Sequence, residues 1–149
     1  MSQPQNSHKI IYLADDDEDD RMLFMDAVSE LDLAIMVKQA EDGQQLLESL
    51  YQAVSEIPEL LFLDINMPGK NGFECLTEIR NADQPFNALK VIMLSTSNNT
   101  YSIAKSYELG ADFYAVKPGT YQELKKLLQN VFSMDWSAFT RDKTGFLIA

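Results

Sequence analysis

Short apolar runs alternate along this chain with segments in which apolar residues recur at helical spacing. The runs cover about residues 9–14, 35–40, 59–64, 89–95 and 112–116. Runs such as LLFL and VIML are apolar at every position, which is typical of strands that are buried on both sides. The repeated strand-then-helix order predicts five strands and five helices, with a parallel sheet covered by helices on both faces.

The first two expected helices have the most distinct apolar positions. The first helix is expected to begin near Asp19. Its apolar positions are Met22, Leu23, Met25, Ala27, Val28 and Leu31. The second is expected to end before Pro58, because the residue that precedes a proline disfavours helical backbone. Its apolar positions are Leu46, Leu47, Leu50 and Val54.

Polar residues stand where four of the apolar runs stop. Asp15 and Asp16 follow IIYLA, Asp64 follows LLFL, Ser95 follows VIML, and Lys117 follows FYAV. The carboxyl ends of parallel strands lie on one side of the sheet, where open α/β sheets bind their ligands. The pattern therefore predicts that three carboxylates, a hydroxyl and an ammonium group meet in one crevice.

Composition narrows the class of protein further. The chain has 149 residues, of which 46% are hydrophobic, so a single compact domain is expected. Its formal charge of -11 opposes the phosphate contacts of nucleic-acid binding. No apolar stretch approaches the roughly 20 residues of a membrane span, and the N-terminal segment has no signal-peptide core, which predicts a cytoplasmic protein. Cys75 has no cysteine partner for a disulfide or zinc cluster and is expected to be a buried helix residue.

The acidic run from Asp15 to Asp20 is open to other interpretations. A calcium-binding loop is a poor match, because Asp20 stands where glycine is required and Asp26 where a bidentate glutamate belongs. The acids from Asp17 to Asp20 are more consistent with a helix N-terminus, whose dipole favours negative charge. Asp15 and Asp16 are different, because two adjacent acids at a strand end repel each other and a bound cation would relieve that repulsion.

The segment LLFLDINMPGKNGFECL carries the most informative single motif. An apolar strand delivers Asp64 into a loop that contains Pro68, Gly69 and Gly72, after which helical spacing resumes. The alternative interpretation is that Asp64 only caps a turn. The polar residues at the other strand ends argue against it.

The motifs YLADDD, LFLDINMPGKNG, VIMLSTS and YAVKP, in this order, resemble the receiver domain of two-component response regulators. The resemblance covers about residues 9–133. It implies the flavodoxin-like (CheY-like) doubly wound sheet of five parallel strands in the order 2-1-3-4-5. Residues 1–8 would then be a flexible N-terminus and residues 134–149 a C-terminal extension, too short for an output domain.

The resemblance also implies a phosphoacceptor and a metal site. Asp64 would take a phosphoryl group from a phosphohistidine on a sensor histidine kinase or a histidine phosphotransfer protein. Asp16 would bind Mg²⁺ directly and Asp15 mainly through water, while Asp64 and the main-chain carbonyl of Asn66 would complete the protein's ligands. These roles agree with the preference of Mg²⁺ for octahedral oxygen ligands with several waters retained.

Further positions match family residues that hold the phosphoryl group. Lys117 would pair with its oxygens, and Pro118 would form the following turn with a cis peptide bond. Ser95 would donate its hydroxyl and move inward on phosphorylation, and Thr96 is a rival that lies one residue further along.

Three other positions match family residues that transmit the signal or set its lifetime. Tyr114 matches the aromatic switch that turns inward, although an amphipathic aromatic residue at a sheet edge is the alternative interpretation. Asn66 and Ser97 match the two positions that control how easily water reaches the aspartyl phosphate.

The segment SMDWSAFTRDKTGFLIA at the C-terminus resembles the tail of single-domain regulators associated with phytochrome-type and hybrid kinases. Its apolar residues are too many for a solvated tail and would either pack onto the domain or form a homodimer. They are Trp136, Phe139, Phe146, Leu147 and Ile148.

The resulting hypothesis is a stand-alone phosphoacceptor that signals through a downstream protein or passes its phosphoryl group onward. It would assist its own phosphorylation and dephosphorylation without being an enzyme. A pseudo-receiver that acts only by interaction is the alternative. A hydrolase of the haloacid dehalogenase type would need a second aspartate two residues after its nucleophile, and the chain has Asn66 there.

Overall fold

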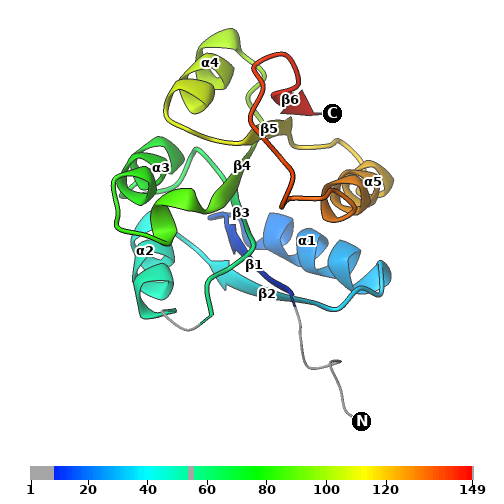
Figure 1. Ribbon diagram of the computed structural model, residues 1–149. Helices are drawn as coiled ribbons and strands as arrows, with labels where there is room; N and C mark the ends of the chain where they lie inside the picture. Colours follow the sequence, from blue (N-terminus) through cyan, green and yellow to red (C-terminus); the bar gives the residue numbers. More distant parts are fainter. Residues whose placement is uncertain (1–8, 54–55, 149) are drawn as a thin grey trace.

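The structure, a computed structural model, describes residues 9–53 and 56–148, and a parallel sheet forms its centre (Figure 1). The strands are β1 (Lys9–Ala14), β2 (Ile35–Ala40), β3 (Leu60–Leu63), β4 (Lys90–Ser95), β5 (Phe113–Val116) and β6 (Leu147–Ile148). Their order is β2-β1-β3-β4-β5-β6, and all neighbouring pairs are parallel. The expected flavodoxin-like order is therefore confirmed, with a sixth strand added beyond β5. The expected flexible N-terminus, residues 1–8, lies outside the described residues.

Five α-helices surround the sheet. They are α1 (Glu18–Glu30), α2 (Gly43–Gln52), α3 (Gly72–Arg80), α4 (Thr100–Glu108) and α5 (Tyr121–Phe132), and a short 3₁₀ helix covers Phe86–Ala88. Each α-helix begins after a side chain that accepts a hydrogen bond from a free N–H of the first turn. The capping residues are Asp17, Asp42, Asn71, Asn99 and Thr120. Within the described ranges, no helix combines the length and the apolar character that a membrane crossing requires.

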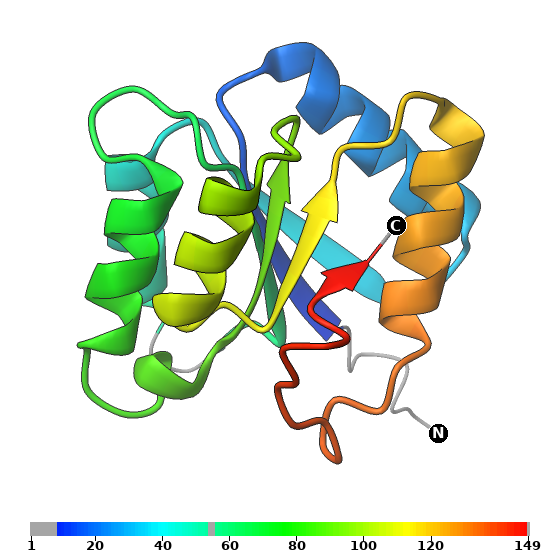
Figure 2. The ribbon, with the colours of Figure 1, turned by 90° about the horizontal axis from the view of Figure 1, so that it is seen from above.

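The helices divide between the two faces of the sheet. Helices α1 and α5 cover one face, and α2, α3 and α4 cover the other (Figure 2). Side chains along each strand alternate between these two cores, as the pleat of a strand requires. Ile11 and Leu13 pack toward α1 and α5, whereas Tyr12 and Ala14 pack toward the opposite layer. Because both faces are covered, the free space for a ligand lies at the ends of the strands.

Helix α1 exposes part of the apolar set that its sequence suggested. Met22 is 58% exposed and Leu23 is 45% exposed. The helix instead buries Arg21, Phe24, Ala27 and Val28. Successive residues of an α-helix turn by about 100°, so three consecutive apolar residues cannot all face the sheet. Met22 and Leu23 therefore belong to the first helix, as expected, but lie on its exposed side, and the helix begins at Glu18, one residue before the expected start.

The other helical expectations agree with the structure where it describes them. In α2, Leu46, Leu47 and Leu50 are buried, while Val54 lies outside the described residues. Cys75 is a buried residue of α3, as expected.

The C-terminal segment packs back onto the domain. The indole N–H of Trp136 donates to the carbonyl of Val131 at 3.0 Å, and its ring lies 5.7 Å from that of Phe113. Strand β6 then pairs with β5, so that the N–H of Tyr114 donates to the carbonyl of Phe146 at 2.9 Å. Most apolar side chains of the tail are therefore packed against the domain, although Leu147 stays exposed. The homodimer remains a prediction.

Candidate functional site at the carboxyl ends of the strands

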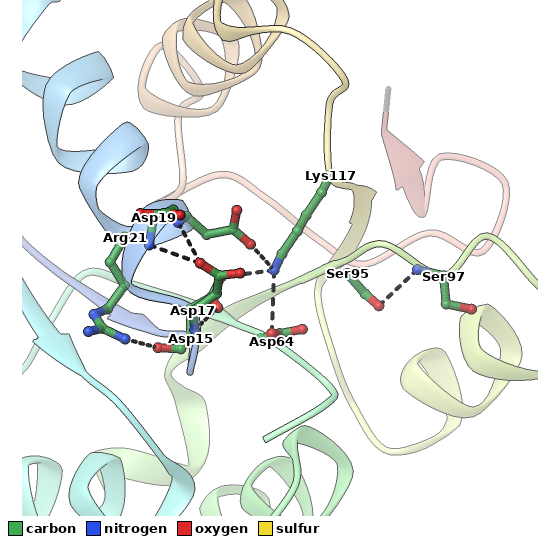
Figure 3. Close-up of polar contacts among 9 residues, drawn as sticks. Asp15, Asp17, Asp19, Arg21, Asp64, Ser95, Ser97 and Lys117 are labelled. Carbon is green, nitrogen blue, oxygen red and sulfur yellow. Dashed lines mark hydrogen bonds and ion pairs between the residues drawn. The ribbon is translucent and has the colours of Figure 1, made fainter. Parts of the chain in front are cut away.

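Three of the expected strand-end residues meet in one crevice. Lys117, after β5, places its Nζ 2.9 Å from Asp15 Oδ2 and 3.4 Å from Asp64 Oδ2 (Figure 3). Asp15 follows β1 and Asp64 follows β3, and both side chains are buried. The convergence predicted from the apolar runs is therefore present for two carboxylates and the ammonium group.

Asp15 is fixed by the segment that leads into α1. Its Oδ1 accepts a hydrogen bond from the N–H of Asp17 at 2.9 Å, and Asp17 in turn caps the helix. The guanidinium group of Arg21 reaches back and donates to the carbonyl of Asp15 at 2.7 Å. Arg21 is buried and also lies 3.9 Å from Glu41. The start of α1 thus holds both the side chain and the backbone of Asp15.

A tight turn after β3 fixes the backbone of Asp64. Gly69 in this turn has a positive φ of 73°, a conformation that favours glycine. Gly72 approaches the strand end so closely that a Cβ at this position would lie 2.3 Å from the carbonyl oxygen of Asp64. The N–H of Gly72 donates to the carbonyl of Ile65 at 2.8 Å. The glycines of the motif therefore let α3 start directly behind the buried carboxylate.

The crevice contains more negative than positive charge. Burial raises the pKa of Asp64 to about 6; the nearby Lys117 lowers it and the Asp15 carboxylate raises it further. Burial alone would lower the pKa of Lys117, but hydrogen bonds to Asp20 and Asp15 and the charge of Asp64 raise it overall. Lys117 is therefore firmly charged, while Asp64 is a carboxylate whose negative charge is incompletely balanced.

The carboxylates suit a divalent cation. Oxygens of Asp15, Asp16 and Asp64 all lie within 4.8 Å of one another. Asp15 and Asp64 are buried and Asp16 is exposed, so the group opens to solvent on one side. A set of carboxylate oxygens is what a hard divalent cation prefers, and its charge would offset the excess of acid. Within the described part of the chain, Asp17, Asp19 and Asp26, which a calcium-binding loop would use together with Asp15, are not in this group, and Asp17 caps α1 instead.

The hydroxyl expected at the end of β4 is Ser95. Ser95 is fully buried and Thr96 is exposed, which favours Ser95 over its rival. The N–H of Ser97 donates to Ser95 Oγ at 3.1 Å, and the hydroxyl of Tyr114 donates to the carbonyl of Ser97 at 2.6 Å. Tyr114 is fully buried, and because β6 lies beyond β5 it is not on an edge strand. A continuous set of contacts thus runs from Ser95 to Tyr114.

Two expected details come out differently or stay untested. The Lys117–Pro118 peptide bond is trans, and the cis bond among the described residues is Gln84–Pro85. The expectation of a cis bond at Pro118 was therefore wrong, and the isomer present is the one that X–Pro bonds intrinsically prefer. Asn66 is exposed, and a hydrogen bond from its backbone helps to lower the pKa of Asp64, while the role of its carbonyl as a ligand stays a prediction.

The site also contains two residues that reasoning from the sequence did not assign to it. Asp20 was interpreted only as a helix N-terminal acid, yet its Oδ2 lies 2.8 Å from Lys117 Nζ. Arg21 follows directly and is buried against Asp15. Both lie on the first turn of α1, which starts beside the strand ends. Their position in the first turn could have indicated a place in the site, because the first-turn side chains of this helix lie next to the crevice.

Comparisons with known proteins show the family of the chain. The family model for the response regulator receiver domain matches residues 11–129. Response regulator Rcp1 of Synechocystis sp. is 31% identical over 139 residues, which cover 89% of this chain and 92% of Rcp1.

Solved structures give the same result. The crystal structure of the phosphorylated cyanobacterial phytochrome response regulator RcpA is similar with a TM-score of 0.80 and 30% identity, over 91% of this chain and 99% of that one. The Mn²⁺-bound form of Rcp1 has a TM-score of 0.73 and 27% identity, over 90% and 99% of the two chains. The chain therefore belongs to the response regulator receiver family.

Proposed function

We propose that the chain is a phosphoacceptor in which Asp64 takes a phosphoryl group from a phosphohistidine in a Mg²⁺-dependent reaction. The observation that carries this proposal is the buried Asp64 carboxylate, which lies beside both the Lys117 ammonium group and the Asp15 carboxylate. The phosphoryl donor is a sensor histidine kinase or a histidine phosphotransfer protein. Membership of the receiver family supports this choice of donor.

The transfer is a displacement at phosphorus. An oxygen of Asp64 forms a P–O bond while the P–N bond to the donor imidazole breaks, and the imidazole nitrogen keeps the electron pair. The products are an aspartyl phosphate and a free histidine. Two anions must approach each other in this step, so positive charge close to both of them lowers the barrier.

The neighbouring residues have distinct roles in this proposal. Lys117 pairs with phosphoryl oxygens from a position where its Nζ already lies 3.4 Å from the Asp64 carboxylate. Ser95 donates its hydroxyl to the phosphoryl group. Asp15, Asp16, Asp64 and the main-chain carbonyl of Asn66 hold the cation. When bound, Mg²⁺ would neutralise charge between the carboxylate and the phosphoryl oxygens.

Transmission begins at Ser95. Its Oγ accepts the N–H of Ser97, and the carbonyl of Ser97 accepts the hydroxyl of Tyr114. A shift of Ser95 toward the phosphoryl group would therefore change the contacts of Tyr114, which is already turned inward. On its other side Tyr114 meets the ring of Phe146, at 6.4 Å between centroids. The altered surface around α4, β5 and α5 then signals to a downstream protein in the cytoplasm, or the phosphoryl group passes onward.

Two residues at the rim would set the lifetime of the phosphorylated state. Asn66 is exposed at the mouth of the crevice, and the hydroxyl of Ser97 accepts a hydrogen bond from the side chain of Asn99 at 2.7 Å. Both side chains are small, so neither covers the crevice with bulk. Replacement of Asn66 by a larger residue would slow hydrolysis of the aspartyl phosphate.

The test is intact mass after incubation with Mg²⁺ and acetyl phosphate. The wild-type chain should gain one phosphoryl group, and the gain should disappear in Asp64→Asn and after addition of EDTA. Asp26→Asn, an exposed acid on α1, is the matched control and should behave as wild type. If the wild-type chain binds Mg²⁺ but gains no mass, the alternative of a phosphorylation-independent interaction module is favoured.

A further inference from the structure

Asp20 competes for the ammonium group on which the proposed chemistry depends. Lys117 Nζ lies 2.8 Å from Asp20 Oδ2, which is closer than its 3.4 Å distance to Asp64 Oδ2. The Asp20 side chain is 37% exposed, whereas that of Asp64 is 8% exposed. Asp20 therefore approaches Lys117 from the solvent side, where an incoming phosphoryl group would also arrive.

The local structure holds Asp20 in this position. The Asp17 side chain accepts hydrogen bonds from the N–H groups of Asp19 at 2.9 Å and Asp20 at 3.2 Å, which fixes the first turn of α1. Asp20 is not one of the three carboxylates grouped for a cation. In the described ranges, the Asp20 side chain has Lys117 as its partner.

Lys117 does not need Asp20 to stay in the crevice. Its Nζ also contacts the buried Asp15 at 2.9 Å, and its side chain is largely buried. An ammonium group has three N–H donors, and three carboxylates now surround it. A phosphoryl group on Asp64 needs at least one of these donors, and the exposed Asp20 is the partner that gives way most easily.

We propose that Asp20 is a positioning residue that competes with the phosphoryl group on Asp64 for Lys117 and thereby weakens the hold of the crevice on that group. This inference rests on the proposed phosphoacceptor function. Removal of the Asp20 charge frees a donor of Lys117 and removes repulsion toward the phosphoryl dianion, while Asp15 keeps Lys117 in place.

The experiment is calorimetric titration of the full chain with beryllofluoride, an anion that adds to a carboxylate oxygen as a phosphoryl mimic, at saturating Mg²⁺. Asp20→Asn should bind it about three- to fivefold more tightly than wild type, the size expected for a partly exposed ion pair. Asp19→Asn removes the same charge from the same helical turn and is the matched control. It should stay within about twofold of wild type, since the effect of a first-turn acid on the helix dipole is small.

A second titration separates this role from a general effect on the site. Mg²⁺ alone should bind Asp20→Asn no more tightly than wild type, because loss of an acid cannot favour a cation. Equal or weaker beryllofluoride binding by Asp20→Asn relative to Asp19→Asn would overturn the inference and leave the proposed function intact. If the wild-type chain itself bound no beryllofluoride in Mg²⁺, the proposed function would fail and the inference with it.

Discussion

Replacement of Asp64 by asparagine should stabilise the metal-free protein at neutral pH. The side chain is 8% exposed, and burial raises its pKa from 3.8 to about 6. Lys117 opposes this shift and Asp15 adds to it. The ionised carboxylate is therefore a net cost to the folded state, and asparagine keeps its shape without its charge.

The pKa difference gives the size of the effect. A rise from 3.8 to about 6 corresponds to ~3 kcal/mol, and little of it is lost to solvent screening because the group is buried. The folded state holds the proton more tightly than the unfolded state, so this cost is absent below pH 4 and fully present above pH 6. Asp64→Asn should accordingly gain ~3 kcal/mol at pH 7.5 and only ~1 kcal/mol at pH 4.5.

Urea unfolding in EDTA measures this gain directly. In a thermal scan the same difference is an increase of roughly 6 to 12 °C for a chain of this size. Asp26→Asn, which removes an exposed charge from α1, should change little. Addition of Mg²⁺ should stabilise the wild type more than the variant, since a cation that binds only the folded state adds to its stability. A variant that is no more stable than wild type at pH 7.5, or a gain that does not shrink at pH 4.5, would refute the reasoning.

Three further predictions concern other close contacts of the domain. Phe146→Ala should lower the free energy of unfolding by ~3 kcal/mol in urea, because the buried ring packs against two tyrosines of the domain; a change below about 1 kcal/mol would mean that the tail is not part of the core. Asp112→Ala should cost ~3 kcal/mol, because it leaves the guanidinium group of Arg80, now 3.0 Å away, without its anion; a double-mutant cycle with Arg80→Met should recover part of this loss. Gly72→Ala should weaken Mg²⁺ binding at least about tenfold in calorimetry, since its Cβ would lie 2.3 Å from the main-chain oxygen of Asp64. Gly119→Ala, which has open space around it, is the control and should bind Mg²⁺ as wild type does.

The sequence predicted the central site because the strands can be recognised as continuous apolar runs. Runs such as LLFL are buried along their whole length, so the first polar residue after each run marks a strand end. Asp15, Asp64 and Lys117 were placed together in this way. The parallel topology then brings these residues together, because the carboxyl ends of parallel strands lie on one side of the sheet.

The helical surroundings were less predictable. Several residues of α1 compete for its buried face, and the sequence alone did not reveal that Arg21 would be buried in preference to Met22 or Leu23. The reason lies in tertiary contact, since the guanidinium group finds the carbonyl of Asp15 at 2.7 Å. The contact of Asp20 with Lys117 was missed for the same reason: 97 residues of sequence separate the partners.

The tail illustrates a third limit. Its composition indicated that it would be buried somewhere, but a strand of only two residues, Leu147–Ile148, carries no periodic signal. What places it is the free edge of β5, whose N–H at Tyr114 would otherwise lack a partner and instead donates to the carbonyl of Phe146. A short segment can therefore add a strand where an edge is open.

The crevice is charged and the core beneath it is apolar, and this contrast is consistent with the proposed switch. The cores on both faces of the sheet are buried and apolar, so their arrangement resists small changes. At the strand ends, Lys117 is shared among three carboxylates, and the charge of Asp64 is costly to the folded state. A bound cation would offset part of this negative charge, and a phosphoryl group on Asp64 would make new contacts with Lys117 and Ser95. Because ligands shift an equilibrium only through differences in interaction free energy, the imbalance at this site would give the proposed phosphorylation its effect on the rest of the domain.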